Sequence, residues 1–161
     1  MKREKPSEEE LEDIYQRFGD PEIKEEEIIL STLKYQGDYP ECKGEVALLI
    51  RNKGKIVGIK HQGGEKFVLP MRRVWKDEEI IKKAEREAKE KTGFEIEIKS
   101  LKEIRKVRFE FSNEELERWH FLFEAESIGG NLEPEDMEGI EEAKLLEEEW
   151  YWNNGFYIIG I

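Results

Sequence analysis

Residues 69–94 read LPMRRVWKDEEIIKKAEREAKEKTGF, and this stretch decides the fold that we expect of the chain. Its second half has apolar residues at helical spacing, which form one buried stripe: Ile80, Ile81, Ala84 and Ala88. Gly93 is well placed to end a helix in the left-handed conformation. The pattern predicts one helix over residues 78–91, preceded by an irregular loop over residues 71–77.

Strand patterns flank this helix on both sides. Residues 45–61 form two apolar runs around the turn NKGK, which is typical of a β-hairpin. Residues 94–111 alternate apolar and charged side chains, as half-buried strands do, and residues 119–126 and 140–146 read as further strands. One helix among many strands predicts an α+β domain with a mixed sheet.

The first 42 residues are expected to form a helical extension, with the main domain spanning residues 43–161. Ser7 and Glu10 have the spacing of a capping box, and Gly19 ends the first helix. Its apolar face is Leu11, Ile14, Tyr15 and Phe18. A helix this short is marginal alone, so we expect it to pack on the main domain or on a second subunit.

The segment DPEIKEEEIILSTLKY, residues 20–35, favours a second helix in this extension. Asp20 can cap a helix, and Pro21 suits the first helical position. Its later part, residues 27–35, equally fits a strand, so this half of the segment is left open.

Composition limits the classes of protein that the chain can belong to. The 161 residues suit one domain; 41% are charged, 37% are apolar, and aromatic residues are plentiful, so we expect a folded acidic protein. A net charge of -12 argues against binding to duplex nucleic acid, because phosphate contacts need clustered Lys and Arg. No apolar run is long enough for a membrane span. Cys42 is the single cysteine, which fits a reducing cytoplasm.

The amide residues are scarce. Three Gln and five Asn accompany a high density of Lys and Glu, which resembles the usage of thermophilic proteins.

Residues 69–94 resemble the signature of the Nudix hydrolases, Gly-x5-Glu-x7-Arg-Glu-U-x-Glu-Glu-x-Gly-U, where U is apolar. The matching positions are Glu78, Arg86, Glu87, Ala88, Glu90, Gly93 and Phe94. The flanking strands also match, so the resemblance covers about residues 44–146. It implies a Nudix-like α/β/α sandwich with a mixed sheet and a loop-helix-loop box.

The resemblance further implies hydrolysis of a nucleoside diphosphate linked to another group, assisted by Mg²⁺ or Mn²⁺. Hard divalent cations held by carboxylates neutralise a diphosphate and acidify the attacking water. Glu87 and Glu90 would be the metal ligands, and Glu78 and Arg86 would pair to hold the loop against the helix. Glu90 and Glu138 are the candidate catalytic residues, and Glu135 is the second choice after Glu138. A loop carboxylate of this kind is more often only solvated.

The box departs from the family signature at positions that bear on activity. Lys91 stands where the signature has its second paired glutamate, and an ammonium group cannot ligate Mg²⁺. Arg72 stands in place of the box glycine, and Met71 in place of the glycine that often precedes it. We expect Lys91 to pair with Glu87 and to replace the charge of the metal. Two functions remain open: a diverged hydrolase with weak activity, or a silent domain that binds a nucleotide derivative or a protein partner.

Other candidate residues carry weaker signals. Arg72, Arg105 and Arg108 could receive phosphates, although charges on a strand surface usually only solvate it. His61 and His120 have no metal-ligand spacing to a second His or Cys. Nudix domains often pair, so a homodimer is possible.

Overall fold

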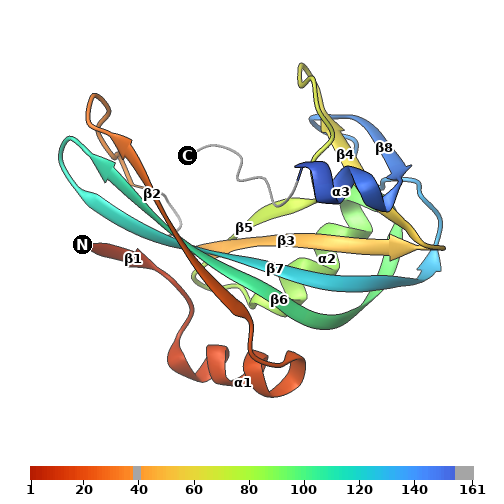
Figure 1. Cartoon of the computed structure of the whole chain (residues 1–161), viewed down its shortest axis with the longest axis horizontal. Helices are drawn as coiled ribbons and strands as arrows, with labels where there is room; N and C mark the ends of the chain where they lie inside the picture. The colour runs from red at the N-terminus through yellow and green to blue at the C-terminus, as the bar shows by residue number, and fades with distance from the viewer. Residues whose placement is uncertain (38–40, 155–161) are drawn as a thin grey trace.

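The computed structural model describes residues 1–37 and 41–154, which form a mixed eight-stranded sheet with helices against it (Figure 1). The strand order is β2-β6-β7-β3-β4-β8, with β1 on β7 and β5 on β3. The elements are β1 Lys2–Glu4, α1 Glu8–Phe18, β2 Glu22–Leu30, β3 Cys42–Asn52, β4 Lys55–His61, β5 Met71–Trp75, α2 Ile80–Thr92, β6 Phe94–Phe111, β7 Glu115–Gly130, β8 Ile140–Leu146 and α3 Glu148–Asn154. The α+β class is confirmed; residues 155–161 of the expected domain lie outside the described residues.

The sheet is covered on both faces because its central strand, β3, is apolar and buried from residue 46 to residue 50. Alternate side chains of a strand point to opposite faces. Val46, Leu48 and Ile50 belong to the core shared with α1 and α2, whereas Ala47 and Leu49 belong to the core on the other face, which includes Tyr151 of α3. Figure 1 shows α2 behind the central strands and α3 on the viewer's side. The expected α/β/α sandwich is therefore confirmed.

The predicted hairpin is formed by β3 and β4. Asn52 pairs with Lys55 across a turn in which Lys53 and Gly54 both have positive φ angles, 51° and 79°. A two-residue loop with both φ positive matches the twist of the strands that it joins. This explains the NKGK sequence.

The box helix begins slightly later than predicted, and the segment before it is more regular. α2 runs from Ile80 to Thr92, and Gly93 ends it in the left-handed conformation, with φ 86°. The expectation of an irregular loop over residues 71–77 is wrong for its first part, because Met71–Trp75 form β5 and pair antiparallel with β3. The pairing buries Val74 completely between the sheet and α2, which gives this segment a reason to be a strand.

The first helix of the extension forms as predicted. Ser7 Oγ accepts a hydrogen bond from the backbone N–H of Glu10 at 3.1 Å, and Gly19 lies at the C-terminal cap. Leu11 and Ile14 are buried in the core that contains α2. The expectation that this helix packs on the main domain is confirmed.

The second helix expected at Asp20 and Pro21 does not form. Residues Glu22–Leu30 are strand β2 instead, paired in parallel with β6. The strand alternative for residues 27–35 is therefore correct for residues 27–30 only. Ile28 and Leu30 pack against the apolar end of β6, and Lys24 reaches Glu103 at 2.8 Å. A helix would have placed Ile28 and Leu30 on different faces, so the two side chains could not both pack on β6.

No helix within residues 1–37 and 41–154 is long and apolar enough to cross a membrane.

Candidate functional site

Helix α2 places charged side chains beside its buried stripe. The stripe consists of the four predicted residues Ile80, Ile81, Ala84 and Ala88, and all are in the core. Three charged residues of the same helix are also buried: Lys83, Glu87 and Lys91. Burial of a charge is costly unless the charge is paired, so the partners of these three side chains define the site.

Lys91 joins the C-terminal turn of α2 to the loop after β7. Its Nζ lies 3.1 Å from Oδ2 of Asp136, and the Lys91 side chain is 11% exposed. This is the ion pair that Lys91 makes among the described residues, so the expected pairing with Glu87 is replaced by one with Asp136. The pKa of Asp136 is lowered by the hydrogen bond from the backbone N–H of Glu138 and by Lys91.

Backbone contacts hold the same loop against α2. The N–H of Asp136 donates to the carbonyl of Glu90 at 2.9 Å, and that of Glu133 donates to the carbonyl of Thr92 at 3.0 Å. Gly93 is required at this point, because a Cβ there would collide with the carbonyl oxygens of Asn131 and Glu133. The loop therefore satisfies carbonyl groups that a helix end leaves without partners.

Glu87 is a buried carboxyl group without an ion pair of 4 Å or less in the described part of the chain, and it is 4% exposed. Burial raises the pKa of Glu87 to about 7, against the opposing attraction of Arg72 and Lys91. Arg72 is exposed on β5, and its charge also acts on Asp136. These contacts gather Arg72, Lys91, Glu87 and Asp136 into one cluster, which we call the box site.

The box site does not fit a divalent metal ion. Mg²⁺ and Mn²⁺ prefer several anionic oxygen ligands. Here the ammonium of Lys91 occupies one ligand position of the signature, and Glu87 is a buried carboxyl group whose pKa is raised to about 7 by burial. No group of three or more His, Cys, Asp or Glu side chains that could hold a metal is found within the described residues. The implied ligand pair Glu87 and Glu90 therefore lacks the donors that a metal would need.

Glu78 lies where the loop meets the helix and contacts three groups. Its Oε1 accepts from the backbone N–H of Trp75 at 3.0 Å, and its Oε2 lies 2.7 Å from Lys83 Nζ and 3.7 Å from Arg86. The structure thus places Arg86 and Glu78 together. The shorter contact with Lys83 was missed, although its position three residues before Arg86 puts both cations on one helix face.

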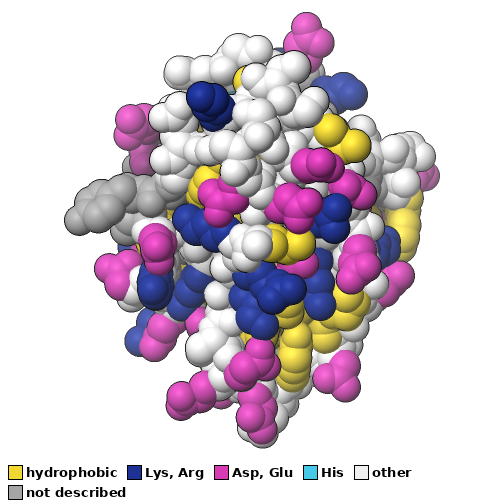
Figure 2. Space-filling view, turned by 90° about the vertical axis from the view of Figure 1, so that its left-hand side faces the viewer, with side chains coloured by type: hydrophobic (Ala, Val, Ile, Leu, Met, Phe, Trp, Pro, Cys, Tyr) yellow, Lys and Arg dark blue, Asp and Glu magenta, His cyan; other side chains and the backbone are white. Residues whose placement is uncertain are grey.

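Arg105 and Arg108 are engaged away from the box helix. Arg105 lies 2.9 Å from Glu26 and 3.0 Å from Glu103, and Arg108 lies 3.2 Å from Glu27. The pairs with Glu26 and Glu27 tie β2 to β6, and a phosphate would have to displace these contacts. Figure 2 shows Lys and Arg side chains lying among Asp and Glu on the side of the molecule where β1 and β2 lie.

Glu138 and Glu135 lie in the loop that Asp136 anchors. Glu138 is exposed, and Glu135 lies 3.7 Å from Lys89. Asp136 between them is the carboxylate that reaches the box helix, and sequence reasoning missed it. The available signal was that it lies one residue from Glu135, within the same acidic run.

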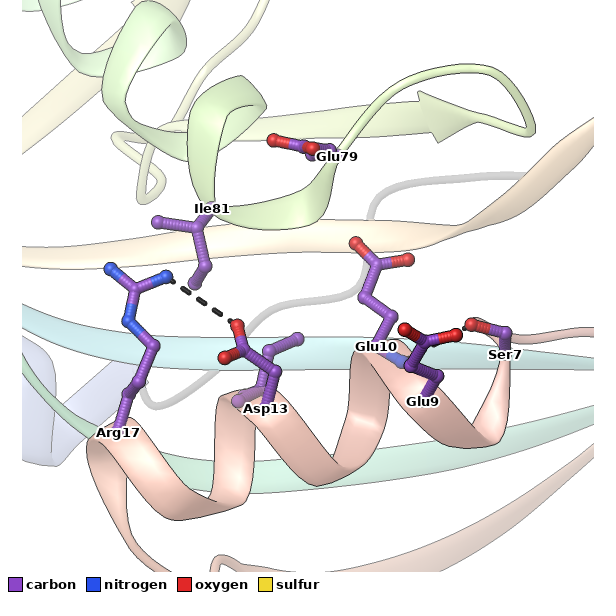
Figure 3. Close-up of a pocket in the computed structure, with 8 residues that line it drawn as sticks. Ser7, Glu9, Glu10, Asp13, Arg17, Glu79 and Ile81 are labelled. Atoms are coloured by element: carbon purple, nitrogen blue, oxygen red, sulfur yellow. Dashed lines mark hydrogen bonds and ion pairs between the residues drawn. The ribbon is translucent and has the colours of Figure 1, made fainter.

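A separate hollow of about 470 Å³ lies between α1 and the start of α2 (Figure 3). Its lining includes four acidic residues: Glu9, Glu10, Asp13 and Glu79. Arg17 contributes a cation, but it is paired with Asp13 at 3.6 Å. An acidic lining repels phosphate, so this hollow does not suit an anionic ligand.

Comparison with solved structures identifies the class of fold. Two structures of Nudix hydrolases from Nitrosomonas europaea match this chain, with TM-scores of 0.53 and 0.51 and identities of 20% and 19%. The first match covers 78% of this chain and 66% of that one; the second covers 68% and 74%. The fold is that of the Nudix hydrolases. No family model and no curated protein matches the sequence.

Proposed function

We propose that this chain is a nucleotide-binding domain of Nudix fold, in which side-chain cations instead of a divalent metal hold the diphosphate of a nucleotide derivative. The observation that carries the proposal is the position of Lys91. Its ammonium lies 3.1 Å from Asp136, at a helix position where the Nudix signature has a carboxylate. Arg72 adds a guanidinium that is exposed and makes no ion pair of 4 Å or less with a described residue.

The protonation of Glu87 favours this function. A deprotonated carboxylate beside a diphosphate would repel it. Because burial raises the pKa of Glu87 to about 7, its neutral form is favoured more than that of an exposed carboxyl group, and its repulsion is reduced. The net charge of the box site then comes largely from Arg72 and Lys91, set against Asp136.

Hydrolysis of the same class of compound is the second candidate. A carboxyl group whose pKa lies near neutral pH is suited to act as a general base. Glu87 would take a proton from water as the water oxygen attacks phosphorus and the bridging P–O bond breaks. However, Glu87 is only 4% exposed, which restricts access of water. Glu90 and exposed Glu138 remain proposed alternatives for this role.

The test compares binding with turnover. The protein is titrated calorimetrically in EDTA with ADP-ribose, a nucleotide sugar and a dinucleoside polyphosphate, and hydrolysis is measured with Mg²⁺ or Mn²⁺. We expect binding in EDTA that weakens in Arg72→Ala, together with little turnover. The absence of binding in EDTA by every compound would contradict the proposal. Rapid metal-dependent turnover would establish the hydrolase instead.

A further inference from the structure

A hollow of about 390 Å³ lies along β5, beside the box site. It is lined by Glu45, His61, Met71, Arg72, Arg73 and Trp75. Within the described residues β5 pairs with β3 alone, so its other edge is unpaired. Arg72 belongs to both places, because it lines the hollow while its charge acts on Glu87 and Asp136.

The lining has a fixed distribution of charge. Arg73 Nε lies 3.5 Å from Oε1 of Glu45, and Oε2 of Glu45 lies 3.1 Å from His120 Nδ1. The Glu45 carboxylate is therefore engaged and 6% exposed. Arg73 is paired with Glu45, so Arg72 is the arginine of this lining that can bind an anionic ligand. A phosphate entering the hollow is directed to Arg72.

Trp75 supplies an aromatic side chain to this lining, and its backbone is held in place. Its side chain is half-buried, and its backbone N–H donates to Glu78 at 3.0 Å. Glu78 is in turn fixed by Lys83 at 2.7 Å. An indole ring stacks well on any nucleobase, because every base has a π face.

We infer that this hollow takes the nucleoside end of the ligand, with the base on the Trp75 ring and the diphosphate passing along Arg72 toward Lys91. The inference rests on the proposed function, since the diphosphate at the box site determines where the nucleoside begins. Ligand pockets are commonly about 300–1,000 Å³, so a hollow of 390 Å³ suits one end of such a ligand. Stacking alone selects a nucleoside without selecting one particular base.

The experiment uses inorganic pyrophosphate, ADP and UDP as probes, titrated into the full chain in EDTA. We expect ADP and UDP to bind more tightly than pyrophosphate, and comparably to each other. Trp75→Leu should weaken ADP binding by about 5- to 150-fold, the range expected for loss of one stacked base, and leave pyrophosphate binding unchanged. Trp75→Phe should retain most of the affinity. The matched control is Trp152→Leu, since Trp152 is 67% exposed on α3.

The outcomes distinguish the nucleoside pocket from the proposed binding of a diphosphate at the box site. Equal binding of pyrophosphate and ADP by the wild-type protein would overturn the nucleoside pocket and leave the proposed function intact. An equal loss of ADP affinity in Trp152→Leu and Trp75→Leu would also overturn it. If neither pyrophosphate nor ADP binds, the proposed function itself fails. The wild-type comparison requires no variant, so it decides even if Trp75→Leu does not fold.

Discussion

Glu10 of α1 caps helix α2: its Oε2 accepts a hydrogen bond from the backbone N–H of Ile80 at 2.9 Å. The residue at the cap position of α2 itself, Glu79, makes no side-chain capping bond. The other oxygen of Glu10 lies 2.7 Å from Lys43 Nζ. The N-terminal helix thus completes the helix that carries the box site.

Replacing Glu10 with Ala should destabilise the protein, because it removes this cap. Loss of a capping side chain typically costs about 0.5–2 kcal/mol, and loss of the Lys43 contact adds to it. The measurement is the free energy of unfolding in urea. Glu9→Ala is the control, since Glu9 is exposed on the same helix. Equal stability of Glu10→Ala and Glu9→Ala would mean that the cap contributes nothing.

Glu4→Gln should have a larger effect. Both oxygens of Glu4 bind Arg118, at 3.0 and 3.1 Å, and both side chains are 1% exposed. Removing one partner of a buried ion pair typically costs about 3–5 kcal/mol, because the other charge stays buried. Arg3→Ala breaks a 3.8 Å pair with Glu117 in which Arg3 is 62% exposed, so it should change stability little. A Glu4→Gln protein as stable as Arg3→Ala would contradict this account.

Lys91→Glu should convert the box site toward metal binding. The wild-type protein should bind Mg²⁺ weakly, and the variant more tightly, because a third carboxylate joins Glu87 and Glu90. In EDTA the variant should also melt at a lower temperature, since Asp136 loses its partner and like charges crowd one helix face. Calorimetric Mg²⁺ titration and melting curves with EDTA or excess metal test both points.

The control for net charge is Lys89→Glu, which changes a half-exposed residue of the same helix. If it strengthens Mg²⁺ binding as much as Lys91→Glu does, the gain is nonspecific. Tight Mg²⁺ binding by the wild-type protein would show that Lys91 does not exclude the ion.

The contribution of Glu87 to the stability of the protein should fall as pH rises from about 4.5 to 7. Burial raises the pKa of Glu87 from 4.5 to about 7, despite the attraction of Arg72. The folded protein therefore keeps a proton that the unfolded chain releases in this window, and ionising the buried group is unfavourable above it. The shift corresponds to a loss of about 3 kcal/mol. Below pH 4.5 Glu87 is protonated in both the folded and the unfolded state, so it no longer makes stability depend on pH.

Glu87→Gln should flatten that dependence, and Glu85→Gln should not, because Glu85 is exposed on the opposite side of the helix. The measurement is the free energy of urea unfolding at several pH values for the three proteins. Parallel pH profiles for wild type and Glu87→Gln would rule out a titrating Glu87.

Sequence periodicity was sufficient to predict the central part of the fold. The stripe of α2, the turn at Lys53 and Gly54 and the cap at Ser7 all depend on nearby residues, and local patterns record such contacts. β2 could not be assigned in the same way, because its strand form depends on β6, which lies far along the chain. Pairing with a distant strand overrides local helix signals.

The box site could likewise be predicted only where it depends on nearby residues. The positions of Arg86, Glu87 and Lys91 on one helix follow from their spacing. The partner of Lys91 does not, because Asp136 arrives on a loop whose path depends on backbone bonds to Glu90 and Thr92. The roles of Glu90, Glu138, Arg105 and Arg108 stay predictions.

The parallel pairing of β1 with β7 also determines when the chain can finish folding. Lys2 lies opposite Leu116, so β1 needs a partner that is made 114 residues later. At about 5–20 residues per second, the ribosome takes roughly 6 to 23 s to supply that partner. Until then Glu4 has no Arg118 to bind and β1 stays unpaired. Strand β1 can therefore join the sheet only after β7 has been synthesised.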